Sequence, residues 1–277
     1  MREPVELQCR KLGEVAEPLD GLAHLVLVGA QSPVSFFAYP GQASDLVPEG
    51  CEVHTLCDRA ESGADAIRAL AAALGTNATQ TSYVDGTRPV RPTGALTAAV
   101  LADAVGAVLP EGAVVIDEAQ TGGIFMSPAT AGCAPHDWIT LTGGSIGFGM
   151  PAATGAAIAC PDRPVVNLQA DGSAMYTMQS LWTQAREGLD VTTIILANRS
   201  YAILNLELSR VGVANPGPVA KSMLDLTRPE LDFCAIARGM GVAAERPEDA
   251  ASLTTAIERA IAEPGPHLIE AVIPSGF

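Results

Sequence analysis

The stretches 164–173, PVVNLQADGS, and 191–200, VTTIILANRS, decide the fold of this chain. Each opens as a buried strand would and ends in oxygen-bearing side chains, Asp171 in the first stretch and Asn198 in the second. A continuous, β-branched run is typical of a strand covered on both faces of a parallel sheet. Consecutive strand ends of such a sheet lie side by side at its carboxyl edge, where open α/β sheets bind ligands. We therefore expect Asp171 and Asn198 to converge on one ligand.

The residues between the two strands predict a helix. Apolar side chains recur at helical spacing from Met178 to Leu189. Ser173 is expected to cap the start of this helix, and Gly188 to end it. The whole segment is then a strand–helix–strand unit with a right-handed crossover.

The ligand types at the strand ends favour magnesium. An aspartate carboxylate, an asparagine amide oxygen and a backbone carbonyl after the turn form a hard set of oxygen atoms. Mg²⁺ prefers near-octahedral oxygen ligation and shares its shell with phosphates and water. Zinc fits poorly, because no cysteine or histidine lies near these positions. The pattern predicts a magnesium clamp for a diphosphate.

A second motif, 142–151 with the sequence TGGSIGFGMP, precedes an expected helix over 152–160. Glycines let the backbone approach a ligand closely, and a helix N-terminus offers free N–H groups to anions. The motif is not a nicotinamide fingerprint, because it lacks the Gly-x-Gly-x-x-Gly spacing and a following acidic residue. It predicts a further contact with the same cofactor.

The Asp-Gly-Ser and Asn motifs resemble the thiamine-diphosphate motif of the acetolactate synthase and benzoylformate decarboxylase superfamily. That family pattern opens with Gly-Asp-Gly and closes with a pair of asparagines. The resemblance implies that Asp171, Asn198 and the carbonyl of Ser200 are Mg²⁺ ligands. It also implies that Gly172 and Ser173 lie at the diphosphate.

The chain departs from the family pattern at two positions. Ala170 replaces the first glycine, and Ala197 replaces the first asparagine of the pair. The second asparagine is the ligand in the family, so Ala197 leaves the metal site intact. Ala170 is unfavourable, by about 1 kcal/mol or more, only if this residue must adopt a positive φ.

The resemblance extends to the glycine-rich motif. It implies that the Gly144 carbonyl accepts a hydrogen bond from the cofactor's aminopyrimidine, and that Ser145 lies beside it. Ile146 corresponds to the apolar wedge that bends the cofactor. No residue of this chain is assigned as a catalytic acid or base.

A third buried strand, over 114–117, also ends in polar residues. The resemblance makes Gln120 and Thr121 contacts at the diphosphate end. Glu118 fits two interpretations: it faces solvent, which we slightly favour, or it steers substrate.

The order of the segments predicts one complete domain and one partial domain. Residues 94–277 form a doubly wound, mostly parallel α/β sheet, the expected thiamine-diphosphate-binding (PP) domain. Residues 76–93 are polar and rich in proline and glycine, and are expected to be a linker. Residues 1–75 resemble part of the family's middle (TH3-like) domain, with strands near 25–28 and 53–56 and a helix over 63–74. In the larger domain, strands are expected near 113–117, 138–141, 164–169, 191–197, 241–244 and 268–273.

No segment matches the family's pyrimidine-binding domain, whose glutamate activates the cofactor. The resemblance therefore implies the thiamine-diphosphate- and Mg²⁺-binding half of an acetolactate-synthase-like transferase or lyase. It would decarboxylate a 2-keto acid and ligate the product to an acceptor. A pyrimidine-binding domain from another chain, in a homo- or hetero-oligomer, would complete the site. Two alternatives stay open: another 2-keto acid decarboxylase or lyase of this superfamily, and a non-catalytic remnant.

Composition excludes several other classes. The chain has 277 residues, 48% hydrophobic content and a net charge of −15, which argues against nucleic acid and anionic membranes as partners. Its six cysteines form no Cys-x-x-Cys pair, and the start lacks a signal-peptide core, so we expect a cytoplasmic protein. The four histidines are scattered in sequence, although distant ones can still meet in space.

Overall fold

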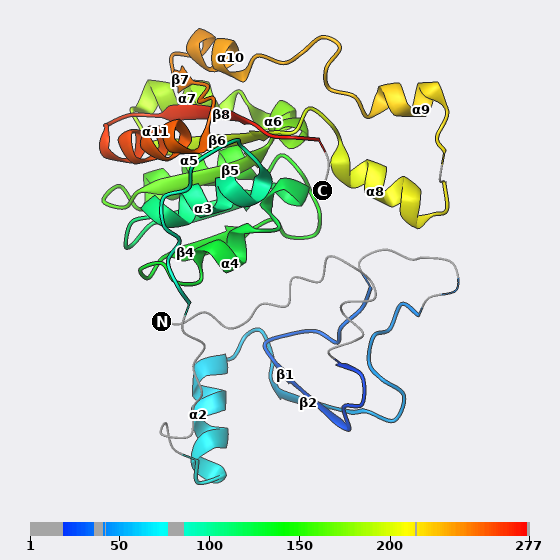
Figure 1. Cartoon of the computed structure of the whole chain (residues 1–277). Coiled ribbons are helices and arrows are strands. Elements are labelled where there is room, and N and C mark those ends of the chain that lie inside the picture. Colours follow the sequence, from blue (N-terminus) through cyan, green and yellow to red (C-terminus); the bar gives the residue numbers. More distant parts are fainter. Residues whose placement is uncertain (1–18, 36–40, 42, 77–85, 214, 276–277) are drawn as a thin grey trace. The chain divides into compact units, whose positions relative to one another are not determined.

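The computed structural model describes residues 19–35, 41, 43–76, 86–213 and 215–275 (Figure 1). The chain divides into two compact units, Met1–Val84 and Asp85–Phe277. Among the described residues, no helix has the length and apolar content needed to cross a membrane.

The second unit contains a six-stranded sheet in the order β4-β3-β5-β6-β8-β7, and every pairing in it is parallel. The α/β, doubly wound sheet expected from the sequence is confirmed. All six expected strands are present: β3 (Val114–Glu118), β4 (Asp137–Thr140), β5 (Val165–Ala170), β6 (Val191–Ala197), β7 (Ala243–Glu245) and β8 (His267–Val272).

Helices cover both faces of this sheet (Figure 1). On β6, Ile194 and Leu196 join the core under α3, α4 and α11, whereas Ile195 and Ala197 join the core under α6, α7 and α10. Because neighbouring strand residues point to opposite faces, burial on both sides requires the continuous apolar run of β6. The described helices of this unit are α3 (Ala98–Val108), η3 (Gln120–Gly123), α4 (Met126–Thr130), α5 (Gly149–Ala159), α6 (Asp171–Thr177), α7 (Ser180–Glu187), α8 (Ala202–Arg210), α9 (Pro218–Met223), α10 (Phe233–Gly239) and α11 (Ala250–Ala262).

The strand order reverses between β3 and β5. The chain leaves β3 for β4 on one side, and then returns to place β5 on the other side of β3. Such a switch point opens a crevice at the carboxyl ends of the strands, where ligands of doubly wound sheets bind. Asp171 follows β5 directly, so this motif begins at the switch point.

The start of the helix after β5 differs from expectation. Helix α6 begins at Asp171, after the extended residue Ala170 (φ −71), so Ser173 lies inside the helix and the predicted Ser173 cap is wrong. The hydroxyl of Ser173 instead donates to the carbonyl of Ala170, at 3.1 Å. The negative φ of Ala170 means that no glycine is needed there. The single helix expected before Gly188 is divided into α6 and α7, and Gly188 ends the second of them in the left-handed conformation, as predicted.

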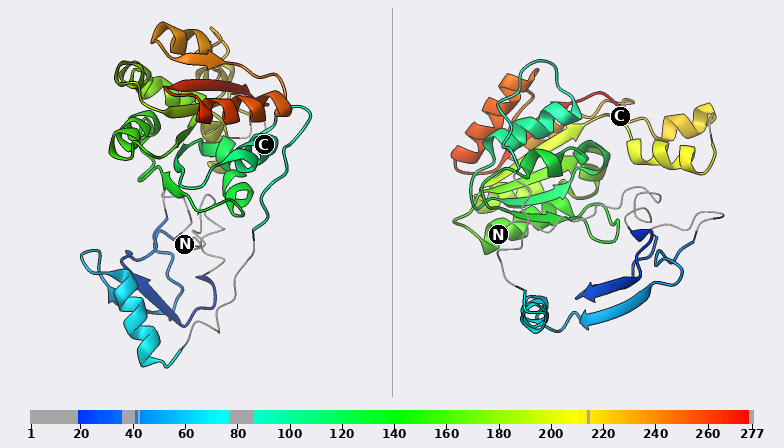
Figure 2. Two further views of the ribbon diagram at one scale, coloured as in Figure 1. Left: turned by 90° about the vertical axis from the view of Figure 1, so that its left-hand side faces the viewer. Right: turned by 60° about the horizontal axis from the view of Figure 1, so that its bottom comes forward.

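Helices α8 and α9 project from the layered part of this unit, as the right-hand view of Figure 2 shows. They follow the Asn198–Ser200 turn, and Ser200 bridges back to Asp225 after α9. The projecting segment is therefore attached at the carboxyl edge of the sheet.

The first unit is small. Its described regular elements are the parallel strands β1 (His24–Val28) and β2 (Glu52–Cys57) and the helix α2 (Gly63–Ala73). The side chain of Ser62 caps α2 by accepting a hydrogen bond from the Asp65 amide, at 3.3 Å. These are the elements that the sequence predicts here.

Part of the expected linker packs against the second unit. Residues 77–85 lie outside the described residues, but Arg88 donates to the carbonyls of Gly106 and Leu109, at 3.1 and 2.7 Å. These bonds hold the start of the second unit on α3. The domain boundaries at 75, 76–93 and 94 stay a prediction.

Two helical glycines give a matched test of packing. A Cβ at Gly106 in α3 would lie 2.4 Å from the carbonyl oxygen of Ala129, whereas a Cβ at Gly155 in α5 meets nothing within 4 Å. We expect Gly106→Ala to destabilise the protein by about 1–3 kcal/mol through overpacking. Gly155→Ala should stabilise it by about 0.5–1 kcal/mol, because glycine is the poorer helix former. Urea unfolding of both variants measures these changes, and equal effects would contradict the packing of α3.

Candidate active site

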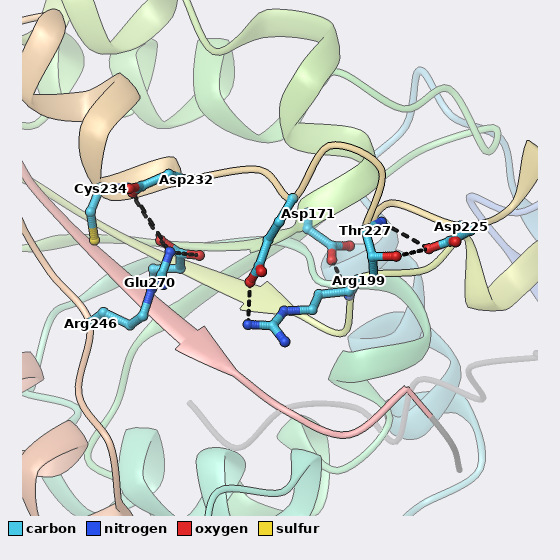
Figure 3. Close-up of polar contacts among 9 residues, drawn as sticks. Asp171, Arg199, Asp225, Thr227, Asp232, Cys234, Arg246 and Glu270 are labelled. Carbon is cyan, nitrogen blue, oxygen red and sulfur yellow. Dashed lines mark hydrogen bonds and ion pairs between the residues drawn. The ribbon is translucent and has the colours of Figure 1, made fainter.

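The carboxylate of Asp171 links the ends of two neighbouring strands. Asp171 is 2% exposed. The amide of Gly172 donates to its Oδ1 at 2.8 Å, and the amide of Arg199 donates to its Oδ2 at 2.6 Å. Figure 3 shows the carboxylate directed at the Arg199 segment, which lies between Asn198 and Ser200. The structure thus brings the Asp171 motif and the Asn198 motif to one place.

The turn after β6 carries two further oxygen atoms of the kind that bind hard cations. The Oδ1 atom of Asn198 accepts a hydrogen bond from the Ser200 amide, at 2.9 Å. The Ser200 carbonyl accepts one from the Ala202 amide, at 2.8 Å. A carbonyl oxygen has two lone pairs, so both oxygens keep one for a cation.

Backbone strain marks the same edge. Among the described residues other than glycine, only Gln120 (φ 52) and Arg199 (φ 59) have a positive φ. Gln120 opens η3 directly after β3, and Arg199 follows β6. Such conformations are costly for residues with a Cβ and concentrate at functional sites. Thr121, the other residue expected at the diphosphate, lies half-buried in the same short helix.

The electrostatics of Asp171 favour a cation. Burial raises the pKa of this carboxyl to about 6, although hydrogen bonds from the Arg199 and Gly172 amides act in the opposite direction. A nearby cation stabilises the ionised form of such a group. The donor set of Asp171, Asn198 and Ser200 consists of hard oxygens, so these residues fit Mg²⁺.

The glycine-rich loop reaches the site from β4. Gly143 and Gly144 have φ values of 67 and 68, which glycine adopts without strain. Ser145 is exposed and Ile146 is half-buried. The Thr177 hydroxyl of α6 donates to the Gly147 carbonyl at 3.0 Å, so the loop is tied to the helix that Asp171 begins.

Glu118 holds the other side of this loop. The side chain is completely buried, so the expectation that it faces solvent is wrong. Its carboxylate accepts hydrogen bonds from the amides of Gly147, at 2.5 Å, and Gly149. Every residue of β3 is buried, because β3 lies inside the sheet and helices cover it. The buried, apolar character of the residues just before Glu118 was the signal that could have predicted this burial.

Sequence reasoning also missed a group of buried oxygens beneath the loop. A Cβ at Gly149 would lie 2.3 Å from Gln169 Oε1, 2.8 Å from Glu118 Oε2 and 3.0 Å from Asn167 Oδ1. Within the described structure, the oxygens of Asn167 and Gln169 have no hydrogen-bond partner. The Gln169 amide donates to the Ser173 hydroxyl at 2.7 Å, so Ser173 belongs to this group. Polar residues inside an apolar strand run were the available signal.

A groove of about 910 Å³ adjoins the turn after β6. Its lining includes Asn198, Arg199 and Ser200, residues of α8, and the segment that follows β8. Lys221 of α9 adds a positive charge to the lining. Asp171 and the glycine-rich loop are not part of it, so the groove flanks the proposed metal side of the site.

Comparison with known families identifies the fold and the cofactor domain together. The profile of the thiamine pyrophosphate enzyme family, C-terminal TPP binding domain, matches residues 124–271. This chain belongs to that family. The match begins directly after η3 and ends within β8, and so includes Asp171, Asn198 and the glycine-rich loop.

Individual relatives agree with this assignment. The chain is 56% identical to the proposed acetolactate synthase large subunit IlvX of Mycobacterium tuberculosis, over 94% of this chain and 50% of that one. It is 32% identical to the benzoylformate decarboxylase of Pseudomonas aeruginosa, over 92% of this chain and 49% of that enzyme. The solved 4-hydroxybenzoylformate decarboxylase of Rhodococcus jostii RHA1 superposes with a TM-score of 0.72 and 26% identity, over 95% of this chain and 51% of that one. The chain therefore spans about half the length of these relatives.

The raised pKa of Asp171 gives a prediction with a definite sign. Between about pH 4 and pH 6 the folded chain binds this proton more tightly than the unfolded chain, so the free energy of unfolding falls as pH rises. In Asp171→Asn this dependence is absent. Relative to wild type without Mg²⁺, the variant should gain about 2–3 kcal/mol between pH 4 and pH 7. Urea unfolding across this range measures the difference.

Asp249 provides a control of opposite sign. Its pKa is lowered by the hydrogen bonds from Ser252, chiefly from the side chain, at the start of α11. Asp249→Asn should therefore lose stability relative to wild type as pH rises. If Asp171→Asn also loses stability relative to wild type as pH rises, burial does not raise the pKa of the Asp171 carboxyl.

Glu118 gives a second prediction. Glutamine is neutral and accepts with only one oxygen, so one of the two loop amides loses its acceptor and the other keeps only a bond without charge assistance. We expect Glu118→Gln to destabilise the protein by about 2–3 kcal/mol. The exposed Glu111, which precedes the same strand, is the matched control, and Glu111→Gln should change stability by less than about 0.5 kcal/mol. Thermal unfolding compares the pair, and indistinguishable variants would contradict the anchoring of the loop.

Proposed function

We propose that this chain is the thiamine-diphosphate- and Mg²⁺-binding half of an acetolactate-synthase-like enzyme that acts on 2-keto acids. The hydrogen bond from the Arg199 amide to Asp171 carries the proposal, because it joins the two motifs that would clamp one metal ion. The reaction of the complete enzyme would be decarboxylation followed by carboligation. The complete enzyme would be a transferase or lyase, and it would act in the cytoplasm.

Each part of the edge has a role in this proposal. Asp171, Asn198 and the Ser200 carbonyl would hold Mg²⁺. The diphosphate would lie against Gln120, Thr121, Gly172 and Ser173. Bound thiamine diphosphate supplies the electron sink for breaking the bond next to a carbonyl. The protein's own task is orientation.

The glycine-rich loop would orient the rings of the cofactor. The Gly144 carbonyl would accept a hydrogen bond, Ser145 would lie beside it, and the half-buried Ile146 would act as the apolar wedge. Glu118 would contribute by fixing the two amides at Gly147 and Gly149.

The proposed partner is a pyrimidine-binding domain from another chain. The relatives are about twice as long as this chain, and the family's activating glutamate has no counterpart among the motifs found here. A homo- or hetero-oligomer that places such a domain against the glycine-rich loop would complete the site.

A second candidate is decarboxylation without carboligation. The likeness to benzoylformate decarboxylase extends over 92% of this chain, which favours it. With the partner present, pyruvate and benzoylformate distinguish the two. Acetolactate from pyruvate supports the first candidate, and benzaldehyde from benzoylformate supports the second. Cofactor binding without turnover of any 2-keto acid would identify a non-catalytic remnant.

Calorimetric titration of thiamine diphosphate in the presence of Mg²⁺ tests the binding claim. We expect saturable binding that EDTA abolishes and that thiamine, which lacks the diphosphate, does not reproduce. Asp171→Asn should weaken binding at least tenfold, about 1.4 kcal/mol or more. Its matched control is Asp162→Asn, an exposed aspartate before β5 that should bind as wild type does.

The titration is repeated with a pyrimidine-binding domain taken from a longer relative. If the wild-type chain shows no Mg²⁺-dependent binding in either arrangement, the cofactor assignment is wrong. Equal weakening by Asp162→Asn would show that charge alone, rather than ligation at the carboxyl edge, controls affinity.

A further inference from the structure

A second group of ligand-type side chains lies in the first unit, on the β1–β2 pair. In the parallel register His24 pairs with Glu52, and Val26 pairs with His54. Paired residues, and residues two apart on one strand, point to the same face of a sheet. His24, Glu52 and His54 therefore share one face, although His24 and His54 lie far apart in sequence.

The donor atoms of these side chains are close together. The Nδ1 atom of His24 lies 3.0 Å from the Nε2 atom of His54. The Oε2 atom of Glu52 lies 3.7 Å from the first nitrogen and 3.9 Å from the second. The three side chains are 63%, 44% and 68% exposed in the order His24, His54, Glu52, so an ion in solution can reach all of them.

Two imidazole nitrogens in direct contact can share only one proton. A divalent cation between them replaces that proton and accepts both lone pairs. Tetrahedral zinc ligands at about 2.0–2.1 Å from the metal lie about 3.3–3.4 Å apart, which is within about 0.6 Å of the observed separations of 3.0, 3.7 and 3.9 Å. Imidazole and carboxylate are the ligand types that suit zinc and its neighbours.

We propose that His24, Glu52 and His54 form a binding site for a divalent transition-metal ion, with Zn²⁺ as the best fit. The two strands hold the ligands in register before the metal arrives. Three protein ligands leave the fourth tetrahedral position to water. This site is distinct in chemistry from the oxygen-only site at Asp171, because its nitrogen donors favour zinc over magnesium.

The other group of potential ligands, Asp232, Cys234 and Glu270, is already occupied. Glu270 accepts two hydrogen bonds from Arg246, both at 2.9 Å, and one from the Cys234 amide, at 3.2 Å (Figure 3). Burial raises the pKa of the Cys234 thiol to about 11, which opposes the thiolate that a metal requires. This group therefore serves as the internal control for the zinc site.

The test uses the full chain without a histidine tag. Zn²⁺ alone is titrated by calorimetry, in buffer free of thiamine diphosphate. We expect one high-affinity ion per chain. Loss of a group that only orients a metal ligand weakens metal binding roughly 10–100-fold. His24→Gln and His54→Gln each remove a proposed ligand and should weaken Zn²⁺ binding by more than this. Glu52→Gln should weaken it by about tenfold. Histidine and cysteine controls outside the site, His136→Gln and Cys234→Ser, should bind as wild type does.

Co²⁺ gives an independent readout of the ligands. Nitrogen and oxygen ligation should produce visible d–d bands without the near-ultraviolet charge-transfer band of a thiolate. A thiolate band in the spectrum of the wild-type chain would overturn the proposal. So would a wild-type affinity for Zn²⁺ equal to that of the His24→Gln/His54→Gln double variant. The spectrum is recorded on wild type, so it decides the matter even if a variant folds poorly. Loss of thiamine-diphosphate binding would leave this result untouched, because the two probes are titrated separately.

Discussion

The hydrogen bond between the Arg199 amide and the Asp171 carboxylate organises the carboxyl edge of the sheet. It ties the first residue after β5 to the turn after β6, and it holds Arg199 in a backbone conformation that only glycine adopts readily. A buried carboxylate without a counter-ion is unfavourable, which is why its pKa is raised. A divalent cation at this edge, as proposed, would stabilise the ionised carboxylate.

The glycine-rich loop depends on this edge and on the buried strand β3. The carboxylate of Glu118 accepts hydrogen bonds from the loop amides of Gly147 and Gly149, and the Thr177 hydroxyl of α6 donates to the Gly147 carbonyl. Three side-chain oxygens crowd the space that a Cβ at Gly149 would take, so a larger residue there would force at least one of these side chains to move. The loop, the strand ends and α6 are thus one connected polar structure, set at the point where the strand order reverses.

The chain's identity as a member of the thiamine pyrophosphate enzyme family follows from its larger unit. The smaller unit raises a separate question, because its exposed histidine–glutamate group has no part in binding a diphosphate. A parallel pair of strands suffices to hold that group, since the ladder fixes which residues are neighbours. The proposed zinc site needs only this local geometry.

The sequence alone determined the six strands of the sheet, the placement of Asp171 and Asn198 at its carboxyl edge, and the glycine-rich loop. These features are local, because hydrophobic periodicity and turn residues specify strands and their ends. Only the tertiary structure decided that Glu118 is buried and binds the loop amides, that a Cβ at Gly149 would collide with Gln169, and that His24 meets His54. Each of these depends on strand order and register, which bring together residues that are distant in sequence. No local pattern carries that information.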